Sequence, residues 1–276
     1  MSPAKSRSRL LPHPREAKVA CGILAVLVVA AAALFVSAAG AEPVQKGNLR
    51  VSFAGRISPR ALPRHGEAPI AVTVGGTITT TDGAPPPQLR GIEIAINRAG
   101  HFDHKGLPSC TYAQIQPSTT AAAMSACGPA KVGEGRFAAN VVLPEQSPFP
   151  SRGRIVAFNG IERGRPVILA HVYGTEPVPL SYTLVLRMTP GKGTWGTVLS
   201  ATLPRVTSDV AYVTGISLTL NRRFTAAGRT HGYVSASCPA PKGFPGATFP
   251  LARASFSFGA AGTLASTLLR SCHAKD

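Results

Sequence analysis

Apolar and polar residues alternate with a period of two along most of the chain after residue 47. Leu49, Val51 and Phe53 fall on one side of such a segment, while Arg50 and Ser52 fall on the other. Because successive side chains of a strand point to opposite sides, this alternation predicts strands with one buried face. The same pattern predicts strands at Ile70–Val74, Ile92–Ile96, Tyr182–Leu186, Trp195–Ala201 and Val210–Leu220, and around Phe256 and Phe258.

The segment Val167–Tyr173 differs from these strands because it is apolar on both faces. Such a strand is expected at the centre of a sheet, where both faces are covered. Turn residues separate the strands at Asp82-Gly83, Asn159-Gly160, Pro190–Gly193 and Ala260–Gly262. Roughly a dozen short antiparallel strands with such turns predict an all-β fold, a β-sandwich, with a barrel as the alternative.

One short helix is predicted inside this β domain. The Ala-rich segment Thr119–Ala126 follows Ser118, whose hydroxyl suits the N-cap position of a helix. The Pro-rich segment 143–153 is the best internal boundary, either between two sheets of one domain or between two small domains. We favour one domain over residues 42–276.

The first 41 residues have the layout of an export signal. Residues 1–18 are basic, residues 19–41 carry no charge, and Ala39-Gly-Ala41 fits the cleavage rule of secretory signals. An apolar helix of this length also suffices to cross a bilayer core of roughly 30 Å, so a retained membrane anchor stays open. Both alternatives place residues 42–276 outside the cytoplasm, either secreted or tethered by a single-pass helix whose N-terminus is cytoplasmic.

Four cysteines follow the signal segment. Cys21 lies inside the apolar run, which leaves Cys110, Cys127, Cys238 and Cys272 in the exported part. An even number of cysteines in an exported domain predicts disulfides. We favour the pairs Cys110–Cys127 and Cys238–Cys272, because each joins neighbours in the sequence.

The composition indicates a folded, basic protein. Apolar residues make up 44% of the chain, enough for a sizeable core, and the formal net charge is +17. This charge predicts attraction to anionic cell-wall polymers or lipid head groups, whereas export removes the protein from nucleic acid. The arginines that flank strands and turns are the candidates for such a surface: Arg152, Arg154, Arg163, Arg165, Arg222 and Arg223.

Candidate catalytic chemistry is sparse. The sequence contains no G-x-S-x-G, H-E-x-x-H or G-x-x-x-x-G-K-[ST] motif. His101, Asp103 and His104 are the only local cluster of metal-ligand types, and a polar loop is the favoured interpretation, so no metal or cofactor is expected. Two His-x-Tyr segments, His171–Tyr173 and His231–Tyr233, each place both rings on one strand face, where the two pairs could meet in a cleft.

Several stretches resemble a group of uncharacterised exported proteins from high-GC actinobacteria. They are Gly106–Cys110 together with Ala126–Gly135, then Val142–Gly153, and then Cys238–Gly246. The resemblance covers most of the exported part and implies export and a β-rich fold, without an activity or site residues.

Together these features favour a non-enzymatic cell-envelope protein with a binding or scaffolding role, directed toward anionic envelope polymers. The alternative is an extracytoplasmic hydrolase or metal-dependent enzyme that uses the histidines. A third hypothesis is a carrier with a small-molecule cavity between its sheets.

Overall fold

The computed structural model describes residues 41–116, 119–142, 145–176, 179–203, 211–226 and 228–275. The predicted basic arm and signal or anchor helix lie outside the described residues. In the part of the chain that the structure describes, no helix combines the length and apolarity that a membrane span requires.

The described chain is mostly β-structure, which confirms the predicted all-β class. The strands are β1 (Ala41–Lys46), β2 (Leu49–Ser58), β3 (Ala61–Pro63), β4 (Ala68–Pro69), β5 (Ala71–Thr80), β6 (Gly91–Asn97), β7 (Gly100–Phe102), β8 (Lys131–Val141), β9 (Phe149–Glu162), β10 (Arg165–Gly174), β11 (Leu180–Pro190), β12 (Trp195–Thr202), β13 (Ala211–Leu220), β14 (Arg223–Ala226), β15 (Arg229–Gly232), β16 (Val234–Ala236), β17 (Gly246–Ser257) and β18 (Thr263–Lys275). The helices are α2 (Tyr112–Ile115) and α3 (Thr120–Cys127), with single 3₁₀ turns at Gly128–Ala130 and Gly259–Ala261.

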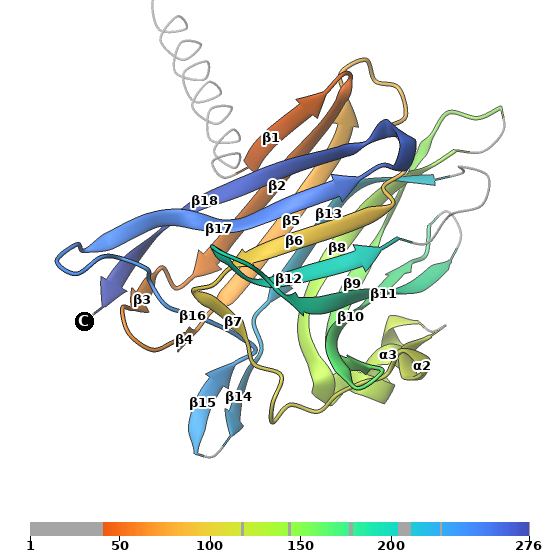
Figure 1. Ribbon diagram of the computed structural model, residues 1–276. Helices are drawn as coiled ribbons and strands as arrows, with labels where there is room; N and C mark the ends of the chain where they lie inside the picture. Colours follow the sequence, from red (N-terminus) through yellow and green to blue (C-terminus); the bar gives the residue numbers. More distant parts are fainter. Residues whose placement is uncertain are drawn as a thin grey trace, which may run out of the picture. The chain divides into compact units, whose positions relative to one another are not determined.

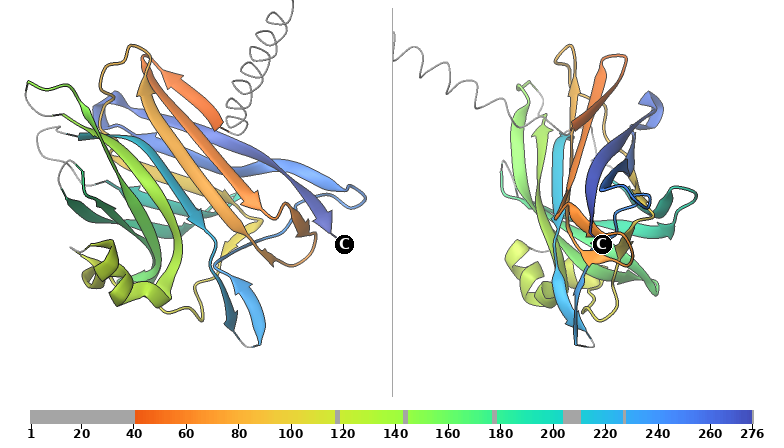
Figure 2. Two further views of the ribbon diagram at one scale, coloured as in Figure 1. Left: turned by 180° about the vertical axis from the view of Figure 1, so that it is seen from behind. Right: turned by 90° about the vertical axis from the view of Figure 1, so that its left-hand side faces the viewer.

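Thirteen of these strands form one hydrogen-bonded sheet, in the order β1-β2-β5-β13-β8-β9-β10-β11-β12-β6-β17-β18-β3. All neighbours are antiparallel except β18 and β3, which run parallel. The sheet curls so that β18 lies beside β1 and β2 (Figures 1 and 2). At this seam the Ser266 hydroxyl donates to the Glu42 carbonyl at 3.0 Å, and Arg270 Nε donates to the Gly55 carbonyl at 2.6 Å.

The predicted sandwich of two sheets is therefore wrong in its architecture. Strands as long as β9, with 14 residues, and β18, with 13, are not the short strands that we expected. Long strands coil as they twist, and glycines let neighbouring strands approach closely where the sheet bends. At Gly153, for example, a Cβ atom would lie 2.2 Å from the Phe137 ring. One curled sheet thus buries the apolar faces that two stacked sheets would otherwise share.

The predicted strand faces are confirmed. Leu49, Val51 and Phe53 of β2 are buried, while Arg50 is exposed. Strand β10, which contains the doubly apolar segment, is seventh of the thirteen strands and is buried on both faces.

The structure contains the predicted helix, as α3, and one further helix, α2. Helix α3 begins at Thr120, and its N-cap is Thr119, whose Oγ1 accepts from the Ala122 amide at 3.2 Å. The cap is therefore not Ser118, which lies outside the described residues. Helix α2 was not predicted, because one turn has no periodicity to detect. Both helices cover the outer faces of β9 and β10, where they bury Phe158 and Leu169 (Figure 2).

One predicted turn is wrong. Asn159 and Gly160 lie inside β9, and the reversal between β9 and β10 uses Arg163 and Gly164, with φ angles of 51° and 74°. Beyond Phe158 strand β8 no longer pairs with β9, and the backbone of Cys110 takes its place: its amide donates to the Asn159 carbonyl at 2.9 Å. The other three predicted turns lie between strands, as expected.

The predicted boundary at 143–153 overlaps strand β9, which begins at Phe149 and pairs with β8. Strands β8 and β9 are antiparallel neighbours as far as Val141 and Phe149. Residues Gly40–Asp276 form one compact unit.

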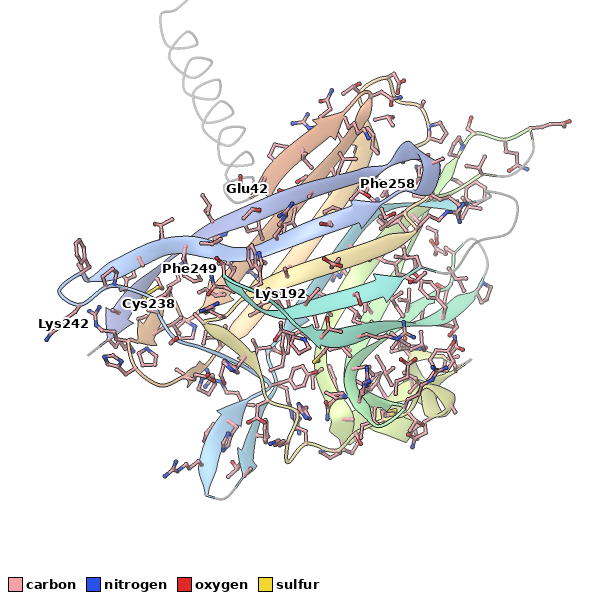
Figure 3. All side chains as sticks on the ribbon, in the orientation of Figure 1. Glu42, Lys192, Cys238, Lys242, Phe249 and Phe258 are labelled. Carbon is pink, nitrogen blue, oxygen red and sulfur yellow. A yellow bond between two sulfur atoms is a disulfide. The ribbon has the colours of Figure 1, made fainter. Side chains whose placement is uncertain are left out.

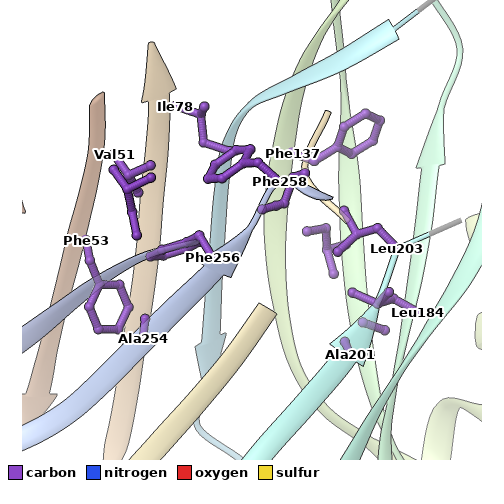
Figure 4. Close-up of a cluster of buried hydrophobic side chains, with 14 of the residues drawn as sticks. Val51, Phe53, Ile78, Phe137, Leu184, Ala201, Leu203, Ala254, Phe256 and Phe258 are labelled. Atoms are coloured by element: carbon purple, nitrogen blue, oxygen red, sulfur yellow. The ribbon is translucent and has the colours of Figure 1, made fainter. Parts of the chain in front are cut away.

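The inside of the curled sheet holds the apolar core in two clusters. In one of them, Phe53 of β2 and Phe256 of β17 meet edge to face with their ring centroids 6.1 Å apart, from opposite walls (Figure 4). The other cluster lies toward the three-stranded sheet β4-β16-β7 and includes Ile168, Leu199 and Phe249.

Candidate ligand-binding site

The inside of the curled sheet encloses an apolar cavity of about 80 Å³. Its walls are inward-facing side chains of both sides of the curl, among them Val72, Ile94, Leu186, Leu218 and Phe249. Strand alternation places these residues inside, because their neighbours in sequence point to the outer face. A cavity of this size has room for on the order of five water-sized groups.

Two polar residues of the described chain, Asn97 and Ser237, contribute to the cavity wall. Asn97 is buried, and its Nδ2 donates to the Pro250 carbonyl at 2.8 Å while its Oδ1 accepts from the Ala99 amide at 2.9 Å. Ser237 lies in the irregular segment after β16. Within the described part of the chain, the lining contains no acidic, basic or histidine side chain.

A second apolar cavity of about 40 Å³ continues the first toward the other end of the sheet. Val74 and Ile94 line both cavities, so these two side chains form the partition between them. Protein interiors are normally packed as densely as organic crystals. By the usual cavity penalty, an empty space of about 80 Å³ lowers stability by about 2 kcal/mol. An occupant would remove this penalty.

The small sheet β4-β16-β7 covers one end of the larger cavity. Phe102 of β7 and Val234 of β16 contribute to the lining, and Ile70, just after β4, joins them. The disulfide Cys238–Cys272 ties the segment after β16 to β18.

Both predicted disulfides are confirmed. The Cα atoms of Cys110 and Cys127 are 5.8 Å apart, and those of Cys238 and Cys272 are 5.7 Å apart. Cys110–Cys127 fastens α3 to the segment that pairs with β9. Two disulfides indicate an oxidising, extracytoplasmic compartment.

The predicted metal candidates do not converge. His101 Nδ1 lies 2.8 Å from Glu67 Oε1, whereas Asp103 Oδ2 lies 3.2 Å from His231 Nδ1 on the β14–β15 hairpin. His101 and Asp103 therefore have separate partners, and His104 joins neither pair. Among the described residues, no group of three His, Cys, Asp or Glu side chains is placed to hold a metal ion.

The two His-x-Tyr segments lie in different parts of the molecule. His171 is fully buried on the outer face of β10, with its ring stacked on Tyr173 at a centroid distance of 6.4 Å. His231 stacks on Phe224 at 5.5 Å, and Tyr233 packs against Phe102 at 5.8 Å in the core. The expected common cleft is not formed.

His171 has an unusual environment. Neither ring nitrogen has a hydrogen-bond partner within the described residues, and the Oγ1 of Thr183, which faces it on β11, also has none. Burial lowers the pKa of His171, so the ring is neutral in the folded protein at neutral pH. Burial also raises the pKa of Tyr182 to about 12. Among the described residues, no charged group contributes to either shift, and burial is its only cause.

His171 makes stability depend on pH. In the unfolded chain it binds a proton below about pH 6.5, whereas the folded state resists this charge, so acid favours unfolding. We expect the urea midpoint to fall between pH 7.5 and pH 5 in the wild type, and to fall less in His171→Leu. The exposed residue His273 supplies the control His273→Leu, which should behave as wild type. Equal falls for wild type and His171→Leu would contradict the prediction.

The candidate arginines do not form one surface. Arg152 and Arg154 lie on β9, and Arg163 lies at its far end, nine residues after Arg154, or roughly 30 Å along an extended strand. Arg165 follows that turn, and Arg222 and Arg223 precede and begin β14. A different group of cations lines a surface pocket beside Cys238: Arg64, Lys242 and Lys275.

Sequence reasoning missed this group, although a signal was present. Lys242 follows Cys238 by four residues, and Lys275 follows Cys272 by three. The predicted disulfide between these cysteines therefore already placed the two lysines near each other.

No protein-family model, no curated protein and no solved structure matches this chain. The resemblance to exported actinobacterial proteins stays a prediction.

Proposed function

We propose that this protein is a non-enzymatic, extracytoplasmic binding protein that holds an apolar ligand inside its curled sheet. The observation that carries the proposal is the cavity of about 80 Å³ with its lining of apolar side chains. An apolar pocket is the default hypothesis for a binding site in a protein of unknown function, and the volume of this one suits a small ligand.

The lining defines the chemistry of the ligand. An alkyl segment loses no hydrogen bonds when it enters the cavity, and each buried methylene contributes about 0.8 kcal/mol. A polar or charged group would instead lose its hydration, because the only polar side chains of the described lining are Asn97, which is already hydrogen-bonded, and Ser237. The ligand class is therefore an alkyl chain or another apolar group.

The other two hypotheses have less support. An enzyme needs an acid, base, nucleophile or metal beside the substrate, whereas the described residues of the cavity lining include no titratable side chain, and His171 lies outside the cavity. Binding of anionic polymer by the predicted arginines needs a continuous surface, and Arg163, just after β9, lies roughly 30 Å along the strand from Arg154.

Filling the cavity tests the proposal. Ala252 is buried in the lining, so the larger side chain of Ala252→Leu would occupy the space of the ligand. We expect at least tenfold weaker binding of butan-1-ol, whose five non-hydrogen atoms match the size of the cavity, as measured by titration calorimetry. The thermal midpoint without ligand should be equal or higher, because the cavity penalty is removed.

The control is Ala260→Leu in the exposed turn between β17 and β18, which should bind as wild type. Absence of butan-1-ol binding to the wild type, or undiminished binding to a folded Ala252→Leu variant, would contradict the proposed function.

A further inference from the structure

Three exposed arginines lie on the outer face of the sheet, where β8 pairs with β9. They are Arg136 of β8 and Arg152 and Arg154 of β9. Their sequence neighbours Phe137 and Ile155 point into the core, so strand alternation directs the arginines away from it. This side of the sheet faces the viewer in the left-hand view of Figure 2. We call these three residues the arginine cluster.

The strand register brings the three arginines close together. Arg136 stands directly opposite Arg154 in the antiparallel pair of β8 and β9. The Cβ atoms of such a pair are about 5 Å apart, and Arg152, two residues from Arg154, is about 7 Å farther along the strand. Like charges directly opposite each other destabilise a sheet. The fold therefore contains a local repulsion that a bound anion would relieve.

The arginine cluster has no counter-ion in the part of the chain that the structure describes. None of its guanidinium groups forms an ion pair or a hydrogen bond with another described residue. Glu134, two residues before Arg136 on the same face, is bound by Lys131, whose Nζ lies 2.9 Å from Glu134 Oε2. Lys131 lowers the pKa of Glu134, and Arg154 adds to the shift. One carboxylate that is shared with a lysine leaves the cluster with a net positive charge.

Small polar residues of β5 and β13 lie beside the arginine cluster. In the register, Ser217 of β13 is the neighbour of Arg136, and Gly75 of β5 is the neighbour of Ser217. One row along the strands, the hydroxyl oxygens of Thr73 and Thr219 are 3.0 Å apart. Such short side chains let an extended chain lie close to the sheet, and their hydroxyl groups can donate to its oxygen atoms.

A further exposed arginine, Arg56 of β2, lies at the other border of these small residues. It is the neighbour of Thr73 in the register. Three strand spacings of about 4.8 Å and one row of about 7 Å separate it from Arg136, or roughly 16 Å in all. One small anion does not span this distance, whereas a linear polymer with several anionic groups does.

A membrane surface fits this face less well than a polymer. Proteins that bind in the plane of a membrane insert large apolar side chains between the lipids. Among the described residues, the exposed large apolar side chains lie elsewhere: none is on β2, β5, β8 or β13, and Ile161 is at the other end of β9 from Arg154. The face therefore offers charge and hydroxyl groups without an apolar anchor.

From this arrangement we infer that the arginine cluster, together with Arg56, binds a linear polymer that carries phosphate or carboxylate groups. Arg136 and Arg154 share one of these groups, because a guanidinium bonds two oxygens of such an anion at once. Arg152 and Arg154 belong to the set predicted from the sequence, whereas Arg136 and Arg56 do not. The site is separate from the apolar cavity and goes beyond the function proposed for it.

The double variant Arg136→Gln with Arg154→Gln tests the inference. The probes are long-chain polyphosphate, polygalacturonate and neutral dextran. We expect the wild type to bind at least one polyanion at low salt, more weakly as salt is added, and not to bind dextran. The double variant should bind the polyanion at least tenfold more weakly, since one exposed ion pair contributes up to about fivefold. The polyanion that binds more tightly identifies the group as phosphate or carboxylate.

The control is the double variant Lys192→Gln with Lys242→Gln. It removes the same two positive charges from the β11–β12 turn and from the loop between β16 and β17 (Figure 3). We expect it to bind the polyanion as the wild type does. Both double variants should keep their butan-1-ol binding, because none of the four residues lines the cavity. Without polymer, the arginine variant should melt at the same temperature as the wild type or higher, because the repulsion is removed.

Three results would overturn the inference. Equal weakening in both double variants would show that net charge alone attracts the polymer. Absence of polyphosphate and polygalacturonate binding at low salt would show that the face binds neither anionic group in a polymer. Tighter binding to phosphatidylglycerol vesicles than to both polymers would assign the face to a membrane surface. A wild type that binds a polyanion but no butan-1-ol would contradict only the proposed function of the cavity.

Discussion

Replacing Cys238 and Cys272 together with alanine is expected to lower the free energy of unfolding by about 4 kcal/mol. This disulfide closes a loop of 34 residues. Releasing the loop raises the conformational entropy of the unfolded chain, and the free energy of unfolding falls by about 4 kcal/mol as a result. Alanine avoids placing a hydroxyl at two buried positions. Urea unfolding under oxidising conditions measures the change.

The disulfide also bears on ligand binding. It ties the loop that bounds both the cavity and the surface pocket of Arg64, Lys242 and Lys275 to β18, so its loss should weaken butan-1-ol binding as well. The control is the double variant Cys110→Ala with Cys127→Ala, whose smaller loop of 17 residues predicts a loss of about 3 kcal/mol. Because that disulfide lies with α3 on the outer face of the sheet, butan-1-ol binding should be unchanged. Equal binding by both double variants would contradict the role of the loop.

Gly135→Ala is expected to destabilise the protein by more than about 4 kcal/mol, or to prevent folding. A Cβ atom at Gly135 would lie 1.9 Å from the carbonyl oxygen of Ser217 in the neighbouring strand β13. That oxygen belongs to the backbone of a paired strand, so it cannot move aside as a flexible side chain could. The β8–β13 pairing would have to break on one side of the curl.

Gly91→Ala in β6 is the matched control. There the nearest atom, the Ala201 carbonyl oxygen, is 3.5 Å from the added Cβ, an ordinary contact. Since alanine also reduces the entropy of the unfolded chain, this variant should be as stable as wild type or up to about 1 kcal/mol more stable. Thermal unfolding followed by far-ultraviolet circular dichroism compares the variants. A Gly135→Ala melting temperature close to that of the wild type would show that β8 can shift without loss of the fold.

The candidate site was only partly predictable. The alternation in Ile92–Ile96 predicts that Ile94 points inward, and the structure confirms it. That Ile94 faces a cavity instead of a filled core depends on Leu186, Leu218 and other side chains from distant strands. That Lys242 and Lys275 line one surface pocket depends on the disulfide Cys238–Cys272 and on the conformation of the loop between β16 and β17. The histidines illustrate the opposite error: His101 and Asp103 are close in sequence, but each finds its partner on another segment.

The sequence by itself determined the elements and their faces. Strand alternation, the doubly apolar segment of β10, the helix after residue 118 and the pairing of neighbouring cysteines all depend on residues close together in the chain, where local geometry decides. Only the tertiary structure decided that these strands form one curled sheet with a cavity. Its closure depends on pairs such as Ser266 and Glu42, which are 224 residues apart, and on how side chains from opposite walls fill the space between them. No local pattern encodes the closure of the sheet or the filling of the space inside it, because both result from the packing of the whole sheet.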